Sequence, residues 1–184
     1  MIFCSFVIPT IGRPTLDRAL QSLVNQTDPD WNAIVVADSV YGFCLPRIDN
    51  RILFVNLSDK SGQSNHGGYV RNHGISHTSG EWIGFLDDDD RLDHDYVMWL
   101  KQEQEGADIV VFRMRYSDGT TLPPGTDIIM GQVGISFAVR NSIVRAKTFG
   151  FGNSDIEDWA FLDVARNQGA RIKVSSRTAY YVRH

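Results

Sequence analysis

The stretch EWIGFLDDDDRLDHDY, residues 81–96, joins a short apolar run to four consecutive aspartates. The run from Glu81 to Leu86 is typical of a buried strand. The four adjacent carboxylates, Asp87 to Asp90, repel one another and exceed the one or two that a polar turn or a helix cap requires. The stretch therefore predicts a strand whose carboxyl end carries a functional site.

A divalent cation with its ligand explains such a run better than a turn does. Mg²⁺ and Mn²⁺ prefer oxygen ligands and often take only one or two protein carboxylates. Alternate side chains of an extended segment point to the same side, so we expect Asp87 and Asp89 to face the ligand. We expect Asp88 to point the other way and Asp90 to brace the loop.

Strands and helices alternate on both sides of this stretch. Apolar runs predict strands at residues 2–8, 31–37, 52–55, 81–86 and 108–114, with Pro9 ending the first. Helical spacing of apolar residues predicts helices from residue 16 to about 27, at 69–77 and at 97–104. This order predicts an α/β fold with a central, mainly parallel sheet flanked by helices.

The rest of the chain is less regular. Residues 117–134 are rich in Gly, Pro and Thr, which predicts a long loop or an irregular hairpin. We expect a strand at 135–139, a short helix from about Ser142, a helix at 156–167, and terminal strands at 172–174 and 179–182. The length of 184 residues fits a single domain, residues 1–184.

The composition is that of an ordinary globular protein, with 42% hydrophobic residues and a net charge of −4. The acidic balance argues against a nucleic-acid partner. No apolar run approaches the roughly 20 residues that span a bilayer, and the start lacks the pattern of a signal peptide. Cys4 and Cys44 have no metal-binding spacing and fit either two inert thiols or a single disulfide. Two inert thiols suggest a reducing compartment, so we expect a cytoplasmic protein.

Further polar residues follow the first two predicted strands. Pro9 and Thr10 end the first, and Asp38 ends the second. Because ligands bind outside the carboxyl ends of parallel strands, these residues are expected to share a crevice with the aspartates. Asp38 fits either an Asx turn or an acceptor for a nucleobase N–H or a ribose hydroxyl.

The segment GGYVRNHGI, residues 67–75, opens a predicted helix with paired glycines. Glycines allow close approach of a ligand, and a helix N-terminus favours anions. Arg71 could therefore bind diphosphate or base oxygens, or it could simply pair with a nearby carboxylate. The absence of GxGxxG after the first strand and of a GxxxxGK[ST] segment disfavours dinucleotide and P-loop binding.

Two candidates for chemistry lie near the end of the chain. Glu157 and Asp158 precede Trp159 at a predicted helix start. Both could serve as capping acids, but a carboxylate beside an aromatic ring is also a candidate general base, because partial desolvation raises its basicity. His184 is either a solvated chain end or a metal ligand.

The ordered set VIPT, VVADS, GYVRNHGI, FLDDDD and IEDW resembles the family 2 glycosyltransferases, which have the GT-A fold. The resemblance covers about residues 6–184. It implies metal-dependent transfer of a sugar from a nucleotide-diphosphate donor, usually a UDP-sugar, to a hydroxyl of a glycan or other acceptor, with inversion at the anomeric carbon. Mn²⁺ or Mg²⁺ is the implied cofactor.

The resemblance also implies roles for individual residues. Asp158 resembles the catalytic base of the family's ED motif, and Asp87 and Asp89 resemble the two acids of its DxD motif. The implied donor-binding residues are Pro9, Thr10, Asp38, Arg71, Asp87 and Asp88, and the implied metal ligands are Asp89 and His184. The family often has two acidic residues after the second strand, where this chain has Ala37-Asp38-Ser39. The residues that would recognise the nucleobase therefore depart from the family pattern.

Two alternatives remain from the residues. A nucleotidyltransferase would also combine an α/β sheet with metal-binding acids, but residues 11–14 supply only one Gly and one Arg to the loop after the first strand. A non-catalytic module that binds sugar nucleotides would keep the crevice without a working base, against which Glu157 and Asp158 argue. The sequence identifies neither the donor sugar nor the acceptor.

Overall fold

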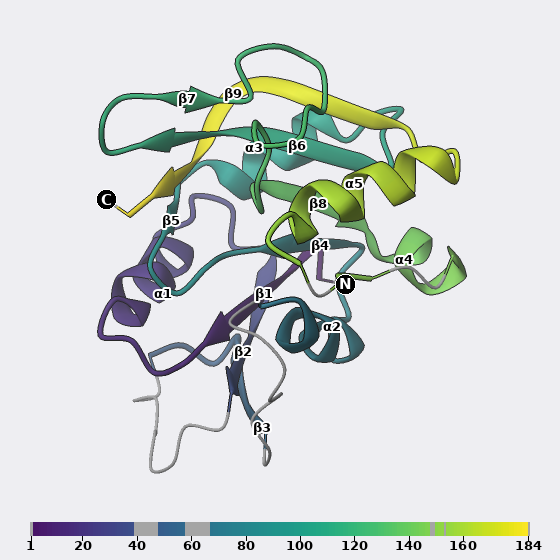
Figure 1. The fold of residues 1–184 in the computed structure, drawn as a ribbon. Coiled ribbons are helices and arrows are strands. Elements are labelled where there is room, and N and C mark those ends of the chain that lie inside the picture. Colours follow the sequence, from purple (N-terminus) through teal and green to yellow (C-terminus); the bar gives the residue numbers. More distant parts are fainter. Residues whose placement is uncertain (1, 39–47, 58–66, 148–149, 153, 184) are drawn as a thin grey trace.

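The computed structural model describes residues 2–38, 48–57, 67–147, 150–152 and 154–183. Its strands, within these ranges, form one sheet in the order β3-β2-β1-β4-β8-β6-β9-β5, with β7 paired to β6 (Figure 1). The strands are β1 (Cys4–Thr10), β2 (Trp31–Asp38), β3 (Ile52–Leu57), β4 (Trp82–Phe85), β5 (Arg91–Leu92), β6 (Ile109–Tyr116), β7 (Thr121–Leu122), β8 (Phe137–Arg140) and β9 (Ile172–Val182). The helices are α1 (Leu16–Val24), α2 (Gly68–Ser76), α3 (Tyr96–Glu103), α4 (Asn141–Lys147) and α5 (Glu157–Asn167).

The sheet is parallel in its N-terminal half and mixed beyond it. β1 pairs in parallel with both β2 and β4, and β2 pairs in parallel with β3. β8 runs antiparallel between β4 and β6, and β9 returns parallel to β6. Figure 1 shows β1 to β3 at one end of the sheet and β6, β7 and β9 at the other. The predicted α/β fold is confirmed, and the carboxyl ends of β1, β2 and β4 meet at one edge.

The expectation that Pro9 ends the first strand is wrong. β1 continues to Thr10, and Pro9 pairs in register with Val36. Along a parallel strand, successive residues direct their backbone groups to opposite neighbours, and the Val7 carbonyl accepts from Leu86 on the β4 side. Pro9 faces that same side, where the pairing with β4 has already ended at Val7. Its missing N–H therefore costs the sheet no hydrogen bond.

The two predicted terminal strands form one. β9 runs without a break from Ile172 to Val182, although its polar middle, Ser175 to Thr178, predicted a gap. Register shifts in the pairing with β6 on either side of Arg113 accommodate this middle within the strand. The predicted irregular hairpin is confirmed, because β7 pairs with the end of β6. The two-residue strand β5 had no recognisable sequence pattern and was not predicted.

The core explains why the helices form where they do. α1 buries Leu16, Ala19, Leu20 and Leu23, which recur at helical spacing on one face. α5 packs through Phe161 against Phe85 of β4 and Phe137 of β8, with ring centroids 6.4 and 5.2 Å apart. The ring centroids of Phe151 and Phe161 lie 4.7 Å apart, so Phe151 extends this aromatic cluster.

Two further sequence expectations concern the thiols and the membrane. Cys4 is fully buried, and burial raises the pKa of its thiol, as expected of an inert cysteine. Cys44 lies outside the described residues. Among the described helices, none combines the length and the apolar character needed to cross a bilayer.

Candidate active site

The acidic run begins directly after β4, at the carboxyl edge of the parallel strands. Asp87, Asp89 and Asp90 offer oxygen atoms that all lie within 4.8 Å of one another. Three carboxylate oxygens at this spacing suit a hard divalent cation such as Mg²⁺ or Mn²⁺. These residues therefore fit the metal that the sequence predicts, although only Asp89 of the three was predicted as a metal ligand.

Asp88 points away from this group, toward the loop after β1. Its Oδ2 accepts from the Thr10 hydroxyl at 2.7 Å, and its Oδ1 pairs with the Arg13 guanidinium at 2.7 Å. Asp88 and Thr10 are both only 3% exposed. The structure thus gives these two predicted donor-binding side chains contacts with each other, which hold the β1 loop against the acidic run.

Arg71 connects the acidic run to α5. Its guanidinium donates to Asp87 Oδ1 at 2.5 Å and also forms a short ion pair with Glu157. Burial lowers the pKa of Arg71, but the charges of Asp87, Asp158 and Glu157 outweigh burial and raise it. The side chain lies against the Phe151 ring, 5.4 Å from its centroid, and Arg71 is 5% exposed. Of the two roles left open by the sequence, the structure favours pairing with carboxylates.

The paired glycines before Arg71 make room for this network. A Cβ at Gly67 would lie 2.8 Å from the Arg71 guanidinium. A Cβ at Gly68 would lie 2.5 Å from Glu157 Oε2 and would collide with the backbone oxygen of Gly152. The close approach that the sequence predicted for a ligand is made instead by the protein's own Arg71 and Glu157.

Asp158 lies beside the Arg71 network, at the start of α5. Burial raises the pKa of its carboxyl group to about 7; the Arg71 charge opposes the rise, and the charges of Asp87 and Glu157 add to it. Its buried Oδ1 has no hydrogen-bond partner among the described residues. A carboxyl group that titrates near neutral pH and keeps one oxygen uncommitted has the properties of a general base.

Residues of β6 and of the segment between β7 and β8 lie next to Asp158. A Cβ at Gly134 would lie 3.8 Å from Asp158 Oδ2 and 2.9 Å from the end of the Met114 side chain. The Tyr116 hydroxyl lies 3.8 Å from Met114 Sδ. Gly134 thus lets the end of the Met114 side chain pack close to the backbone beside Asp158.

Asp90 is held from the last strand. Its Oδ1 accepts from the Arg183 N–H at 2.8 Å, and its carboxylate hydrogen-bonds the Tyr180 hydroxyl. The same hydroxyl accepts from the Asp87 N–H at 3.0 Å. Burial raises the pKa of Asp90 to about 7, and the charge of Asp87 adds to the rise. Sequence reasoning missed Tyr180 and Arg183, because nothing in the sequence places β9 beside the acidic run.

The remaining candidates lie at the same edge or outside the described residues. Thr10 pairs in register with Ala37, so Asp38, which is half-buried, directly follows the partner of Thr10. Pro9 precedes Thr10 in β1 and is half-buried. His184, the predicted second metal ligand, lies outside the described residues, and its role stays a prediction.

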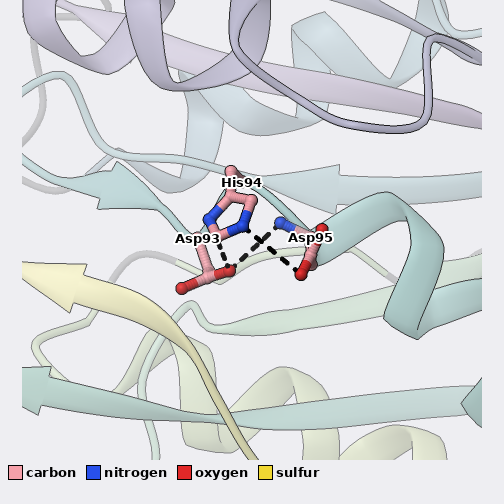
Figure 2. A group of neighbouring side chains, drawn as sticks. All are labelled: Asp93, His94 and Asp95. Carbon is pink, nitrogen blue, oxygen red and sulfur yellow. Dashed lines mark hydrogen bonds and ion pairs between the residues drawn. The ribbon is translucent and has the colours of Figure 1, made fainter.

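A second group of acids follows β5, in the turn before α3. Figure 2 shows the His94 ring between Asp93 and Asp95, with its two nitrogens 3.3 and 3.4 Å from their carboxylates. Tyr181 donates to Asp93 at 3.0 Å, and Thr27 donates to Asp95 at 2.7 Å. These contacts tie the turn to β9 and to the segment after α1, which accounts for the acids structurally.

Comparison with known proteins identifies a family whose model covers most of the chain. The model of Glycosyl transferase family 2 matches residues 5–171, a range that contains every candidate residue named above from Pro9 to Asp158. A curated relative, the GalNAc(5)-diNAcBac-PP-undecaprenol beta-1,3-glucosyltransferase of Campylobacter jejuni, is 34% identical over 96 residues. The matched region covers 48% of this chain and 30% of that relative.

Solved structures of S. aureus TarS share the fold. A crystal structure of TarS residues 1–349 superposes with a TM-score of 0.80 at 20% identity, covering 98% of this chain and 60% of that one. A complex of TarS 1–349 with UDP-GlcNAc gives a TM-score of 0.77 at 20% identity, covering 98% and 58%. The chain thus spans less than two thirds of each of these proteins.

Proposed function

The chain belongs to glycosyl transferase family 2, and we propose that it transfers a sugar from a UDP-sugar donor to a hydroxyl of a glycan or another acceptor. The observation that carries this proposal is the position of Asp158. This carboxyl group, with a pKa of about 7, is close enough to Arg71 and to Asp87 of the acidic run for both charges to act on it. A base next to a cation and diphosphate site is what transfer to a hydroxyl requires.

The donor end of the proposed site is the carboxyl edge of β1, β2 and β4. Asp87 and Asp89 would hold Mn²⁺ or Mg²⁺ together with the donor diphosphate, and Pro9 and Asp38 would line the space for base and ribose. Thr10 and Asp88 would support that space by holding the β1 loop. A bound cation would neutralise charge that develops on the departing nucleoside diphosphate. The UDP-GlcNAc complex of TarS, which shares the fold, supports a UDP-sugar as the donor.

The chemical step uses Asp158. Its carboxylate accepts the proton of the acceptor hydroxyl while the acceptor oxygen forms a bond to C1 of the sugar. The bond between C1 and the diphosphate oxygen breaks, and its electron pair leaves with the nucleoside diphosphate. Attack opposite the leaving group inverts the configuration at C1. Arg71 orients Asp158 indirectly, because it holds the neighbouring Glu157.

The test is incubation of the protein with a panel of UDP-sugars and Mn²⁺, with UDP release as the readout. Slow hydrolysis of one donor, with release of UDP, supports the proposal without knowledge of the acceptor. Release of pyrophosphate from UTP and a sugar phosphate would identify a nucleotidyltransferase instead. Binding of UDP-sugars without turnover, even with hydroxyl acceptors added, would identify a binding module.

A further inference from the structure

We propose that Arg13 and Arg183 form a clamp for the donor diphosphate. In the free protein the two guanidinium groups face Asp89, and they turn to the diphosphate when a divalent cation takes that carboxylate. The inference rests on the proposed function for the identity of the donor, but it concerns only the diphosphate, so it can be tested separately. Neither arginine belongs to the residues that the family resemblance implies.

The geometry places both arginines at the same oxygen of Asp89. Arg13 Nη1 and Arg183 Nε each lie 3.6 Å from Asp89 Oδ2. The two arginines come from opposite ends of the chain, Arg13 from the loop after β1 and Arg183 from the residue that follows β9. They converge on the member of the acidic run that was predicted to bind the metal.

Their contacts with Asp89 are weak, whereas their backbones are held. At 3.6 Å the guanidinium nitrogens are too far for good hydrogen bonds, and the side chains are 47% and 79% exposed. An exposed ion pair of this kind contributes little, typically about 0–1 kcal/mol. Turning the Arg183 guanidinium away from Asp89 therefore costs the protein little. Arg13 Nη1 stays paired with Asp88 Oδ1 at 2.7 Å, so Arg13 would offer its other guanidinium nitrogens to the diphosphate.

The backbone of Arg183 is fixed by several contacts around it. Its N–H donates to Asp90 at 2.8 Å, and its φ of 50° is an unusual value for a residue other than glycine. Two residues earlier, the Tyr181 hydroxyl donates to Asp93 at 3.0 Å, and Arg91 lies over the Tyr181 ring at 3.9 Å. The end of β9 thus presents an exposed guanidinium at the acidic run.

The charges explain why the arginines would exchange partners. A divalent cation at Asp89 neutralises the carboxylate and repels both guanidinium groups. A nucleoside diphosphate brings several anionic oxygens, which the planar fork of an arginine binds through paired hydrogen bonds. The predicted diphosphate ligand, Arg71, is buried and already paired with Asp87 and Glu157, so the exposed arginines are better placed for this role.

The experiment measures binding rather than turnover, with Arg183→Gln as the main variant, because the Arg183 side chain is 79% exposed. We expect Mn²⁺ with pyrophosphate, and Mn²⁺ with UDP, to bind this variant about tenfold more weakly than wild type, the effect of losing one charge-assisted contact. Mn²⁺ alone should bind several-fold more tightly, because a competitor for Asp89 is gone. Titration calorimetry and the spin-resonance signal of free Mn²⁺ provide the two readouts.

The matched control is Arg166→Gln, which removes the same charge from α5, where Arg166 pairs with Asp163. Its binding of Mn²⁺ and of pyrophosphate should equal that of wild type. Arg13→Gln should behave as Arg183→Gln does, and a thermal unfolding curve checks that loss of its contact with Asp88 leaves the fold intact.

Several outcomes would overturn the clamp. These are unchanged binding of Mn²⁺ and pyrophosphate by Arg183→Gln, an equal loss in Arg166→Gln, weaker binding of Mn²⁺ alone, or a wild-type protein that does not bind pyrophosphate with Mn²⁺. A wild-type protein whose binding of pyrophosphate depends on these arginines, but which neither binds nor hydrolyses UDP-sugars, would support the clamp and refute the proposed function.

Discussion

Arg71 and Glu157 form a buried ion pair between the second helix and the start of α5, 86 residues apart in sequence. The other side of the same guanidinium holds Asp87, so one arginine joins the acidic run to the segment that carries Asp158. The positions of the proposed metal site and of the proposed base are therefore not independent.

Replacing Arg71 with Met should strongly destabilise the protein. The change leaves Asp87 and Glu157 without their shared cation, and removing one partner of a buried ion pair typically costs about 3–5 kcal/mol. Urea unfolding followed by circular dichroism measures the loss. The control is Arg166→Met, whose exposed pair with Asp163 should be worth no more than about 1 kcal/mol. Equal losses in both variants would contradict a special role for Arg71.

Asp158→Asn should reduce turnover by about 10²–10⁴-fold, because an amide cannot accept the proton of the acceptor. UDP binding in the presence of Mn²⁺ should change little, since the proposed donor site lies at the acidic run. Donor hydrolysis and calorimetry with UDP measure the two effects. Asp163→Asn, on the same helix, should keep wild-type turnover. A turnover near that of wild type in Asp158→Asn would refute the assignment of the base.

The turnover of the wild-type protein should rise with pH and level off above about pH 7. Asp158 acts only when ionised, and burial raises its pKa from 3.8 to about 7. A pH profile of donor hydrolysis between pH 5 and 9 provides the measurement. A rate that is already maximal at about pH 5 would show that Asp158 either ionises normally or is not the base.

The same pKa has a consequence for stability. Because the folded protein holds a proton on Asp158 that the unfolded chain has lost, this residue makes the free energy of unfolding fall between about pH 4 and pH 7. Asp158→Asn removes that decrease, so the variant should gain stability relative to wild type as the pH rises through this range. Urea midpoints of both proteins at pH 4.5 and 7.5 test the sign. A constant difference would contradict the raised pKa.

Gly68→Ala should weaken the Arg71 network. The new methyl group would meet Glu157 Oε2 at 2.5 Å and collide with the Gly152 backbone, and such overpacking typically costs about 1–3 kcal/mol. We expect a lower melting temperature and lower turnover. Gly125→Ala is the control, because a Cβ there would have no neighbour within 4 Å. If Gly68→Ala is as stable as wild type, the start of α2 can move away from Gly152 and Glu157 without loss of stability.

Asp89→Asn should abolish most of the dependence of UDP binding on Mn²⁺. Asp95→Asn, in the second acidic group, should leave that dependence unchanged, because the Asp95 carboxylate is engaged by Thr27 and His94. Calorimetry with UDP, with and without Mn²⁺, separates the two groups. If UDP binding loses its dependence on Mn²⁺ in Asp95→Asn but keeps it in Asp89→Asn, the cation binds at the second acidic group instead.

The sequence predicted the fold, and it located the candidate site at the carboxyl edge of the parallel strands. Both follow from local signals: apolar runs mark the strands, and unusual polar residues mark their ends. It did not predict how those residues pair with one another. Arg71 is buried rather than exposed because Glu157, far along the chain, folds against the glycines at the start of α2. Such contacts depend on packing between distant segments, which no local pattern reports.

The contribution of β9 was missed for the same reason. Neither the two residues of β5 nor the polar middle of β9 carries a clear strand pattern, and both strands are defined by their partners. Tyr180 and Arg183 reach the acidic run only because β9 lies between β6 and β5. The residues that hold the predicted aspartates in place could therefore not be identified before the sheet order was known.

The dependence of the acidic run on β9 also bears on folding kinetics. The contacts of Asp87 with Tyr180 and of Asp90 with Arg183 each close a loop of 93 residues. Contacts of such high sequence separation form late, because the entropy of closing the loop is lost before the contact stabilises the chain. During refolding, we expect the parallel half of the sheet to form first and cation binding to appear only with the docking of β9. Cation binding would then indicate that folding is complete.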